Sequence, residues 1–302
     1  MSIRFAINDS PLAGRDGDKV QSRVIRDRLL AEAEGNVAIR VSETDDKDAF
    51  EVAGRGELQL GVLIETMRRE GFEMTIGRPK VLFRQDPDSG QRQEPMEDVT
   101  IDVDDEFTGV VVEKIAERKG EMMEMRPFGV GRIRITFLMP SRGLIGYHGE
   151  FLTDTRGTGI MHRLYRGYAA YMGPIPGRHR GAIVSAQTGT SVPFALWNFE
   201  ERGTLFIGPG EQVYEGMIIG ENAKLSDLEV NPLKAKQLTN ISADGKDHAV
   251  RLTPPRSMSL EQAIAYIGED EVVEVTPSHT RLRKATLDPH QRKRERRAAM
   301  AR

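Results

Sequence analysis

The chain carries one arrangement that could hold an anion, the glycine-flanked arginine Gly54-Arg55-Gly56 directly before a predicted helix. Backbone N–H groups at the start of a helix bind phosphate and other anions. The same glycines would also permit a sharp strand-to-helix turn that holds no ligand. No further phosphate-binding residue follows, so the structural interpretation is slightly favoured over an anion site.

Other signatures of catalysis or of metal binding are mostly absent from the sequence. No G-x-x-x-x-G-K-[ST] stretch is present to hold a triphosphate, and neither H-E-x-x-H nor G-x-S-x-G occurs. The paired acids Asp104-Asp105 are expected to cap a helix rather than to act in acid–base chemistry. The histidines show no metal-ligand spacing. We therefore expect no catalytic residue, no cofactor and no metal in this chain.

Composition narrows the class of protein further. The 302 residues are 38% hydrophobic and 29% charged, which is typical of a soluble globular protein. The absence of cysteine excludes disulfides and thiolate chemistry and favours a cytoplasmic location. No apolar run approaches the roughly 20 residues needed to cross a bilayer, so no membrane partner is expected.

Three basic regions could bind nucleic acid. The segment 141–180 holds six arginines, no lysine and two acids, interleaved with tyrosines that could stack on bases. The polar stretch 231–256 resembles a mobile cationic loop, and residues 281–302 have a local charge of about +7 on a chain whose net charge is −3. Each region alone has a plain explanation as edge packing or a solvated surface, but together they favour RNA. The cations predicted to contact RNA are Arg142, Arg156, Arg163, Arg166, Lys234, Lys236, Lys246, Arg251, Arg256, Arg283 and Lys284.

The elements that would position these residues follow a repeated order. Alternating apolar residues and helical stripes give strand, helix, strand, strand, helix, strand within 1–85 and again within 95–176, which is the ferredoxin-like βαββαβ plan. Strands are expected near 37–41 and 131–138, among others. The polar stretch 86–94 is predicted to be a linker. Residues 177–302 are predicted to form a mainly β domain with a long basic loop, a helix near 260–267 and a basic tail. The fold class is therefore α+β.

Three sequence blocks carry a resemblance to known proteins. The motif SPLAG at 10–14, the segments SRVIRDRLL and NVAIRV, and GRGELQLG at 54–61 resemble the third domain of ribosome-bound translation GTPases of the elongation factor G type. The stretches EPMEDVTIDVDDEFTGVVVEKIAERKGEM and MPSRGLIGYHGEFLTDTRGTGIM resemble the fifth domain of that group. RGTLFIGPGEQVYEGMIIGE, KQLTN, LTPPRSMSLEQAIAYI and VEVTPSHTRLRK are similar to the BipA/TypA GTPases alone.

This resemblance implies a ribosome-associated factor, linked to subunit assembly and growth under stress. The GTP-binding domain and the β-barrel domain that open such proteins are missing from these residues, so GTP and Mg²⁺ would belong to the absent domain and Met1 to an artificial or altered start. In the family the loop around KQLTN approaches transfer RNA in the A site and 23S ribosomal RNA. That maps onto Lys236, Gln237, Leu238, Thr239 and Asn240, with Ser242 where the family usually has arginine. A monomer is expected.

Two alternatives differ in class from this one. The first is a stand-alone RNA-binding protein of the RRM type, which would need aromatic residues on its central strands. Around 131–138 the exposed positions are instead Arg132, Arg134 and Thr136. The second is a small-molecule regulatory module, which would need an apolar pocket at a sheet edge.

Overall fold

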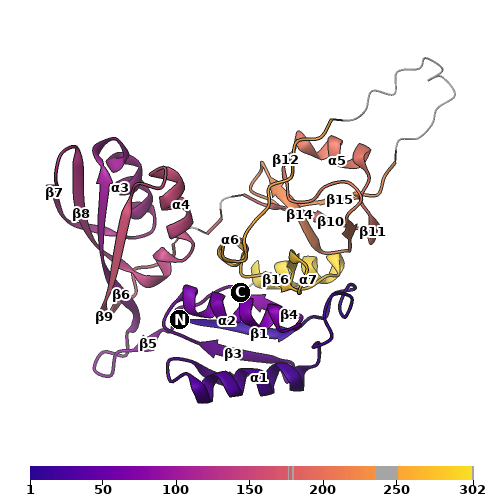
Figure 1. The fold of residues 1–302 in the computed structure, drawn as a ribbon, viewed down its shortest axis with the longest axis horizontal. Helices are drawn as coiled ribbons and strands as arrows, with labels where there is room; N and C mark the ends of the chain where they lie inside the picture. The colour runs from indigo at the N-terminus through magenta and orange to yellow at the C-terminus, as the bar shows by residue number, and fades with distance from the viewer. Residues whose placement is uncertain (176, 179, 236–250, 301–302) are drawn as a thin grey trace.

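The computed structural model describes residues 1–175, 177–178, 180–235 and 251–300, which form three units. The first unit contains strands β1–β4, the second unit contains β5–β9, and the C-terminal unit contains β10–β17. In Figure 1 the second unit stands apart at the left, while the C-terminal unit lies directly above the first. The α+β fold expected from the sequence is confirmed.

The first unit has the ferredoxin-like strand order β4-β1-β3-β2, with every neighbouring pair antiparallel. Helix α2 buries Leu60, Leu63, Ile64 and Met67 on the face that was predicted. It ends because Gly71 adopts a positive φ of 91°, which lets backbone N–H groups cap the last carbonyls. The elements are β1 (Ser2–Ile7), α1 (Ser22–Gly35), β2 (Arg40–Glu43), β3 (Ala49–Ala53), α2 (Glu57–Arg69) and β4 (Met74–Gly77).

Strand β2 begins later than the predicted strand at 37–41. The backbone N–H of Ile39 donates to the carbonyl of Asn36 at 2.9 Å, and the N–H of Ala38 donates to the Asn36 side chain at 3.2 Å. These bonds form a turn across the first three positions of the expected strand. The alternating residues Val37 and Ile39 therefore lie in the turn and not in the sheet.

The second unit repeats the order with its own sheet and its own core. Strand β9 pairs with β6, and the sheet continues through β8 to β7. Strand β5 and the start of β6 form a short hairpin, whose turn and second strand occupy the stretch 86–94 that was predicted as a linker. The elements are β5 (Arg84–Gln85), β6 (Arg92–Asp104), the 3₁₀ turn Asp105–Phe107, α3 (Thr108–Glu117), β7 (Glu121–Pro127), β8 (Arg132–Pro140), the 3₁₀ turn Ser141–Leu144, α4 (Tyr147–Asp154) and β9 (Ile160–Ala170).

The C-terminal unit continues the sheet of the first unit. Strand β16 pairs antiparallel with β4, from Val272 opposite Gly77 to Val275 opposite Met74, so one sheet of 10 strands spans both units. The elements are β10 (Ala182–Ser185), β11 (Gly189–Thr190), α5 (Pro193–Glu200), β12 (Gly203–Leu205), β13 (Gln212–Val213), β14 (Met217–Asn222), β15 (Leu228–Val230), α6 (Leu260–Tyr266), β16 (Glu271–Val275), β17 (Thr280–Lys284) and α7 (Pro289–Met300).

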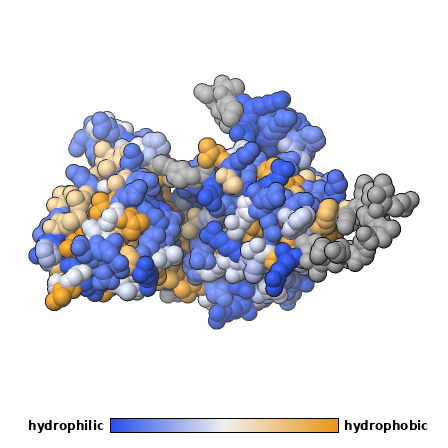
Figure 2. Space-filling view, turned by 90° about the horizontal axis from the view of Figure 1, so that it is seen from above, coloured by the Kyte–Doolittle hydropathy of each residue, from blue (hydrophilic) through white to orange (hydrophobic). Residues whose placement is uncertain are grey.

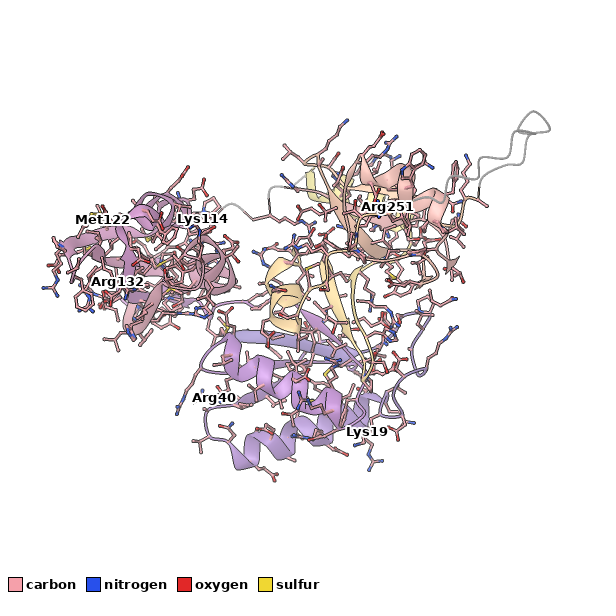
Figure 3. The ribbon with its side chains drawn as sticks, turned by 45° about the horizontal axis from the view of Figure 1, so that its top comes forward. Lys19, Arg40, Lys114, Met122, Arg132 and Arg251 are labelled. Atoms are coloured by element: carbon pink, nitrogen blue, oxygen red, sulfur yellow. The ribbon has the colours of Figure 1, made fainter. Side chains whose placement is uncertain are left out.

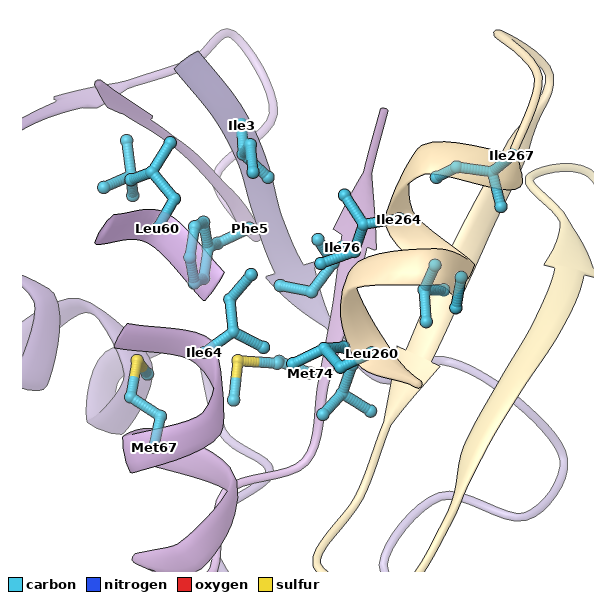
Figure 4. Close-up of a cluster of buried hydrophobic side chains, with 14 of the residues drawn as sticks. Ile3, Phe5, Leu60, Ile64, Met67, Met74, Ile76, Leu260, Ile264 and Ile267 are labelled. Atoms are coloured by element: carbon cyan, nitrogen blue, oxygen red, sulfur yellow. The ribbon is translucent and has the colours of Figure 1, made fainter. Parts of the chain in front are cut away.

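One hydrophobic core joins the first and C-terminal units. Helix α6 begins with a capping box formed by Ser259 and Gln262 and lies beside α2 on the same side of the sheet (Figure 4). Its buried Leu260 and Ile264 belong to the same cluster as Phe5. A shared sheet and a shared core mean that these two units should unfold together. The second unit has a separate cluster.

None of the described helices is long and apolar enough to span a membrane.

Candidate RNA-binding surface

Within the arginine-rich segment, Arg142 is held inside the protein. Its side chain is 15% exposed, forms a two-pronged ion pair with the fully buried Glu94, and donates to the carbonyl of Gly173. Because Nε and one terminal nitrogen are engaged and the side chain is largely buried, little of this guanidinium is left for a phosphate. The structure thus gives Arg142 a structural role in place of the RNA contact expected from the sequence.

The other three arginines predicted in this segment lie along or near β9. Arg163 pairs with Glu97 at 2.9 Å and approaches Glu57 of α2 at 3.7 Å. Burial alone would lower the pKa of Arg163, but the hydrogen bond with Glu97 and the charges of Glu97 and Glu57 together raise it. Arg166 is half exposed and pairs with Asp98 at 3.1 Å. Arg156 is exposed, and its guanidinium lies 5.5 Å from the Phe107 ring.

The two cations predicted at the end of β17 are buried, which corrects the sequence-based expectation. Arg283 is 2% exposed and pairs with Asp9, and it also donates to the hydroxyl of Thr75 at 3.2 Å. Lys284 is 3% exposed, with its Nζ 2.7 Å from Asp227 and 2.9 Å from Glu271. Buried cations are retained by such pairs and do not reach a phosphate. Arg283 and Lys284 instead form ion pairs that hold β17 against Asp9, Asp227 and Glu271.

The long polar stretch is described only at its two ends. Lys234 and Arg251 are exposed there and have no acidic partner in the described parts of the chain (Figure 3 labels Arg251). The predicted contacts Lys236, Gln237, Thr239, Asn240 and Lys246 lie outside the described residues. An exposed cation therefore lies at each end of the polar stretch 231–256.

A cationic cluster, defined as Arg180, Arg202, Lys224 and Arg256, surrounds the end of β14. Glu221 accepts from Arg180 at 3.2 Å and lies 4.0 Å from Arg256, with those arginine side chains 60% and 50% exposed. The carbonyls of Arg202 and Lys224 accept backbone N–H groups from Ala223 and Gly181, each at 2.8 Å. Of this cluster only Arg256 was named as an RNA contact, although Arg180 ends the arginine-rich segment 141–180. The members are brought together by the ends of β10, β12 and β14 and not by sequence proximity.

Helix α7 displays further cations. Arg292 anchors it, with a side chain 14% exposed that pairs with Glu229 at 2.8 Å and donates to the carbonyl of Thr286. The cations beyond it are exposed, which gives this surface helix the basic character predicted for the terminal segment. They are Lys293, Arg294, Arg296 and Arg297. In the space-filling view of Figure 2, hydrophilic residues cover most of the visible face.

The open face of the second sheet does not offer a stacking platform of the RRM kind. Arg134 donates twice to Asp102, at 2.6 and 2.7 Å, and the neighbouring Arg132 lies 3.5 Å from Asp104. The hydrogen bond from Arg134 lowers the pKa of Asp102 and keeps the pair ionised. Ion pairs between the inner strands β6 and β8 thus occupy positions where an RRM would need aromatic residues.

The described residues offer little for a small ligand or a metal. A hollow of about 230 Å³ on the sheet face is lined by charged side chains, including Arg4, Asp9 and Asp46. A second, of about 350 Å³, lies between α1 and α2 and not at a sheet edge. Among the described residues no group of three or more His, Asp or Glu could hold a metal ion. The apolar sheet-edge pocket that a regulatory module would need is not formed by either hollow.

Comparison with known proteins defines the class of protein first. Residues 91–178 match the family model described as "Elongation factor G C-terminus", so the second unit is of the kind found in translation factors. Residues 180–289 match the model of the TypA/BipA C-terminal domain. The chain belongs to the BipA/TypA family and corresponds to its C-terminal part.

Individual relatives agree with this assignment. The "Large ribosomal subunit assembly factor BipA" of Salmonella typhimurium is 49% identical over 295 residues, covering 97% of this chain and 48% of that protein. The protein of the same name from Synechocystis is 45% identical over 284 residues, covering 94% and 47%. The chain spans about half the length of these curated relatives. A crystal structure of a protein from Thermus thermophilus aligns with a TM-score of 0.37 at 12% identity over 57% of this chain and 41% of that one, a similarity from which nothing follows about the fold.

Proposed function

We propose that this chain is the ribosome- and RNA-binding part of a BipA/TypA protein and that it acts in assembly of the large subunit and in translation under stress. The observation that carries the proposal is the cationic cluster of Arg180, Arg202, Lys224 and Arg256, which lies within the family-specific region. The names of the relatives support a role in large-subunit assembly. The exposed cations of α7 and the ends of the long polar stretch add to this surface.

We do not assign GTP hydrolysis, the reaction of the family, to this chain. The 302 residues contain no triphosphate-binding motif, so GTP hydrolysis with Mg²⁺ is assigned to a separate domain of the family. This chain would bind as a monomer in the cytoplasm, with 23S ribosomal RNA and A-site transfer RNA as its contacts. Residues 236–246 would face the transfer RNA, and the cationic cluster would face ribosomal RNA phosphates.

The test is co-sedimentation of the chain with large subunits and with 70S ribosomes at 50 and 200 mM salt. If the four cations of the cluster each neutralise one phosphate, affinity falls about 50- to 150-fold over this range. Reversing both Arg202 and Lys224 to glutamate should lower the slope of log affinity against log salt by about 1.4 to 1.8. Reversing Arg40 and Lys47, which are exposed on the first unit, changes net charge equally and should leave the slope unaltered.

Two results would contradict the proposal. A wild-type chain that fails to co-sediment at 50 mM salt has no ribosome-binding function. Equal slopes for the wild type and the Arg202/Lys224 variant would remove the cationic cluster from the interface. A further variant that reverses Lys234, Lys236 and Lys246 tests the long polar stretch separately.

A further inference from the structure

Two aromatic rings and two arginine side chains form a cluster at the base of the second unit, which we call the ring–arginine cluster. The guanidinium carbon of Arg92 lies 3.7 Å from the centre of the Phe83 ring and 4.8 Å from that of Tyr171. On Tyr171 a second guanidinium follows, that of Arg142, at 4.7 Å. The rings of Phe83 and Tyr171 also meet edge to face, with their centres 5.9 Å apart, so Arg92 lies against both rings, and Phe83 is 37% exposed.

Backbone hydrogen bonds hold the ring–arginine cluster in place. Strand β5 pairs with β6, and the N–H of Tyr171 donates to the carbonyl of Arg92 at 3.0 Å. Asp86 closes the hairpin turn by accepting the N–H groups of Asp88 and Ser89 at 2.9 and 3.0 Å. A ring and a guanidinium that stack on a hydrogen-bonded hairpin are already ordered before any ligand arrives, which reduces the entropy lost on binding.

A second arginine–aromatic contact lies beside the ring–arginine cluster. Arg84 places its guanidinium carbon 4.2 Å from the Tyr168 ring, while its Nε donates to Gln93 at 2.7 Å. Tyr165 meets Tyr168 edge to face at 6.4 Å and is 59% exposed. We call Phe83, Arg84, Arg92, Tyr165, Tyr168 and Tyr171 together the hairpin site.

The arginines in and beside the hairpin site differ in whether an acidic side chain already pairs with them. Arg142 is engaged by the buried Glu94. Arg84 and Arg92 are exposed, and neither has an ion-pair partner among the residues that the structure describes. The turn acid Asp86 is occupied by its own backbone and by the side chain of Gln93. Two guanidinium groups without an ion-pair partner among the described residues thus lie against the partly exposed rings of Phe83 and Tyr168.

We propose that the hairpin site binds an unpaired stretch of RNA. A base stacks on the open side of Phe83 or on Tyr165, and the adjoining phosphates contact Arg84 and Arg92. Ring faces with flanking cations suit a polyanion whose π faces are free, whereas a duplex hides those faces. This inference rests on the proposed function, since it names a further RNA contact and the form of RNA that it takes.

The test uses the full chain and a fluorescein-labelled single-stranded oligoribonucleotide, with a duplex of equal length for comparison. Loss of one stacked base should weaken single-strand binding about 5- to 150-fold in Phe83→Leu. Arg92→Lys keeps the charge but loses the planar stack, so it should also weaken binding. Phe128→Leu is the matched control, because Phe128 is 41% exposed with the guanidinium carbon of Arg134 at 3.7 Å from its ring, on the β7–β8 turn. The control should bind as the wild type does.

A second measurement does not depend on loss of binding. In a chain with Trp197→Phe and Phe83→Trp, fluorescence of the new indole should be quenched by single-stranded oligouridine and much less by duplex. Absence of quenching, equal single-strand affinity for Phe83→Leu and wild type, or an equal loss in Phe128→Leu would each overturn the inference. Quenching by a proline-rich peptide but not by RNA would assign the site to a protein partner and would also overturn it. Failure of the wild type to co-sediment with ribosomes would instead count against the proposed function.

Discussion

Replacing Lys284 with methionine should destabilise the protein without touching an RNA-binding surface. Lys284 is 3% exposed, and its Nζ lies 2.7 Å from Asp227, 3.0 Å from Asp270 and 2.9 Å from Glu271. Removing one partner of a buried ion pair costs about 3–5 kcal/mol. Glu271 keeps Arg178, at 2.8 and 2.9 Å, and Asp270 is 71% exposed. The cost should therefore be at the lower end, about 3 kcal/mol.

Urea unfolding at pH 7 measures this cost. Trp197 is the one tryptophan and lies on α5 of the C-terminal unit, so its fluorescence reports on the unit that contains Lys284. With an m-value of about 3 kcal/mol/M, a loss of about 3 kcal/mol moves the midpoint by about 1 M. Lys224→Met is the matched control, because Lys224 is exposed and should change stability by less than about 0.5 kcal/mol.

The pH dependence separates this mechanism from a loss of packing. Burial alone would raise the pKa of Glu271, but the hydrogen bond from Arg178 and the charge of Lys284 lower it below the usual 4.5. A carboxylate with a lowered pKa stabilises the fold above its unfolded pKa, and this stability is lost as pH falls through the folded pKa. The cost of Lys284→Met should therefore shrink below about pH 4. A cost under about 1 kcal/mol at pH 7, a cost independent of pH, or weaker RNA binding with normal stability would refute the reasoning.

Three further predictions test the joints between the units. Ile264→Ala should cost about 2–5 kcal/mol and should also raise amide exchange in β1, because both belong to one core; unchanged exchange in β1 would separate the units. Gly146→Ala should lower the melting temperature, because φ is 73° and the new methyl group would lie 2.7 Å from a side-chain carbon of α6, whereas Gly149→Ala has open space and should not. Burial alone would raise the pKa of Asp16, but hydrogen bonds from two side chains of the β16–β17 connection lower it. Asp16→Asn should then cost about 1 kcal/mol at pH 7, and urea titrations should show the difference disappearing as pH falls below about 3.8.

The sequence reveals local elements well because their periodicity is local. The face of α2 and the strands of both ferredoxin-like units follow from alternating and helical patterns. Helix α5, with the sequence PFALWNFE, was not predicted, because apolar residues surround it and leave no amphipathic stripe. The pairing of β4 with β16 joins residues 195 to 201 positions apart, and no local pattern specifies such a partner. The boundaries set at 85/86, 94/95 and 176/177 remain predictions.

The functional surface was less predictable, because charge in a sequence does not reveal exposure. Arg283 and Lys284 look like part of the basic tail, yet their partners Asp9 and Asp227 are distant in sequence and bury them. Conversely, Arg202 follows two acidic residues in the sequence, so nothing in the sequence marked it as part of a basic surface. Its place in the cationic cluster depends on where β12 meets the end of β14. A list of basic residues thus overestimates some contacts and misses others.

The glycine motif before α2 does not form an anion site, and Glu57, which follows it directly, contacts the second unit. The N–H of Arg55 donates to the side chain of Gln59 at 2.8 Å, and Glu57 places a carboxylate at the same helix end, which would repel a phosphate. That carboxylate instead accepts the N–H of Gly146 at 3.3 Å and lies 3.7 Å from Arg163, both in the second unit. A partly exposed pair of this kind contributes about 0–1 kcal/mol. The second unit is therefore attached by these weak polar contacts and by the packing of Gly146 against Ala265 of α6, while the first and C-terminal units are fused through a sheet. If RNA binding reorients any part of the chain, the second unit and its hairpin site should move as one body relative to the rest.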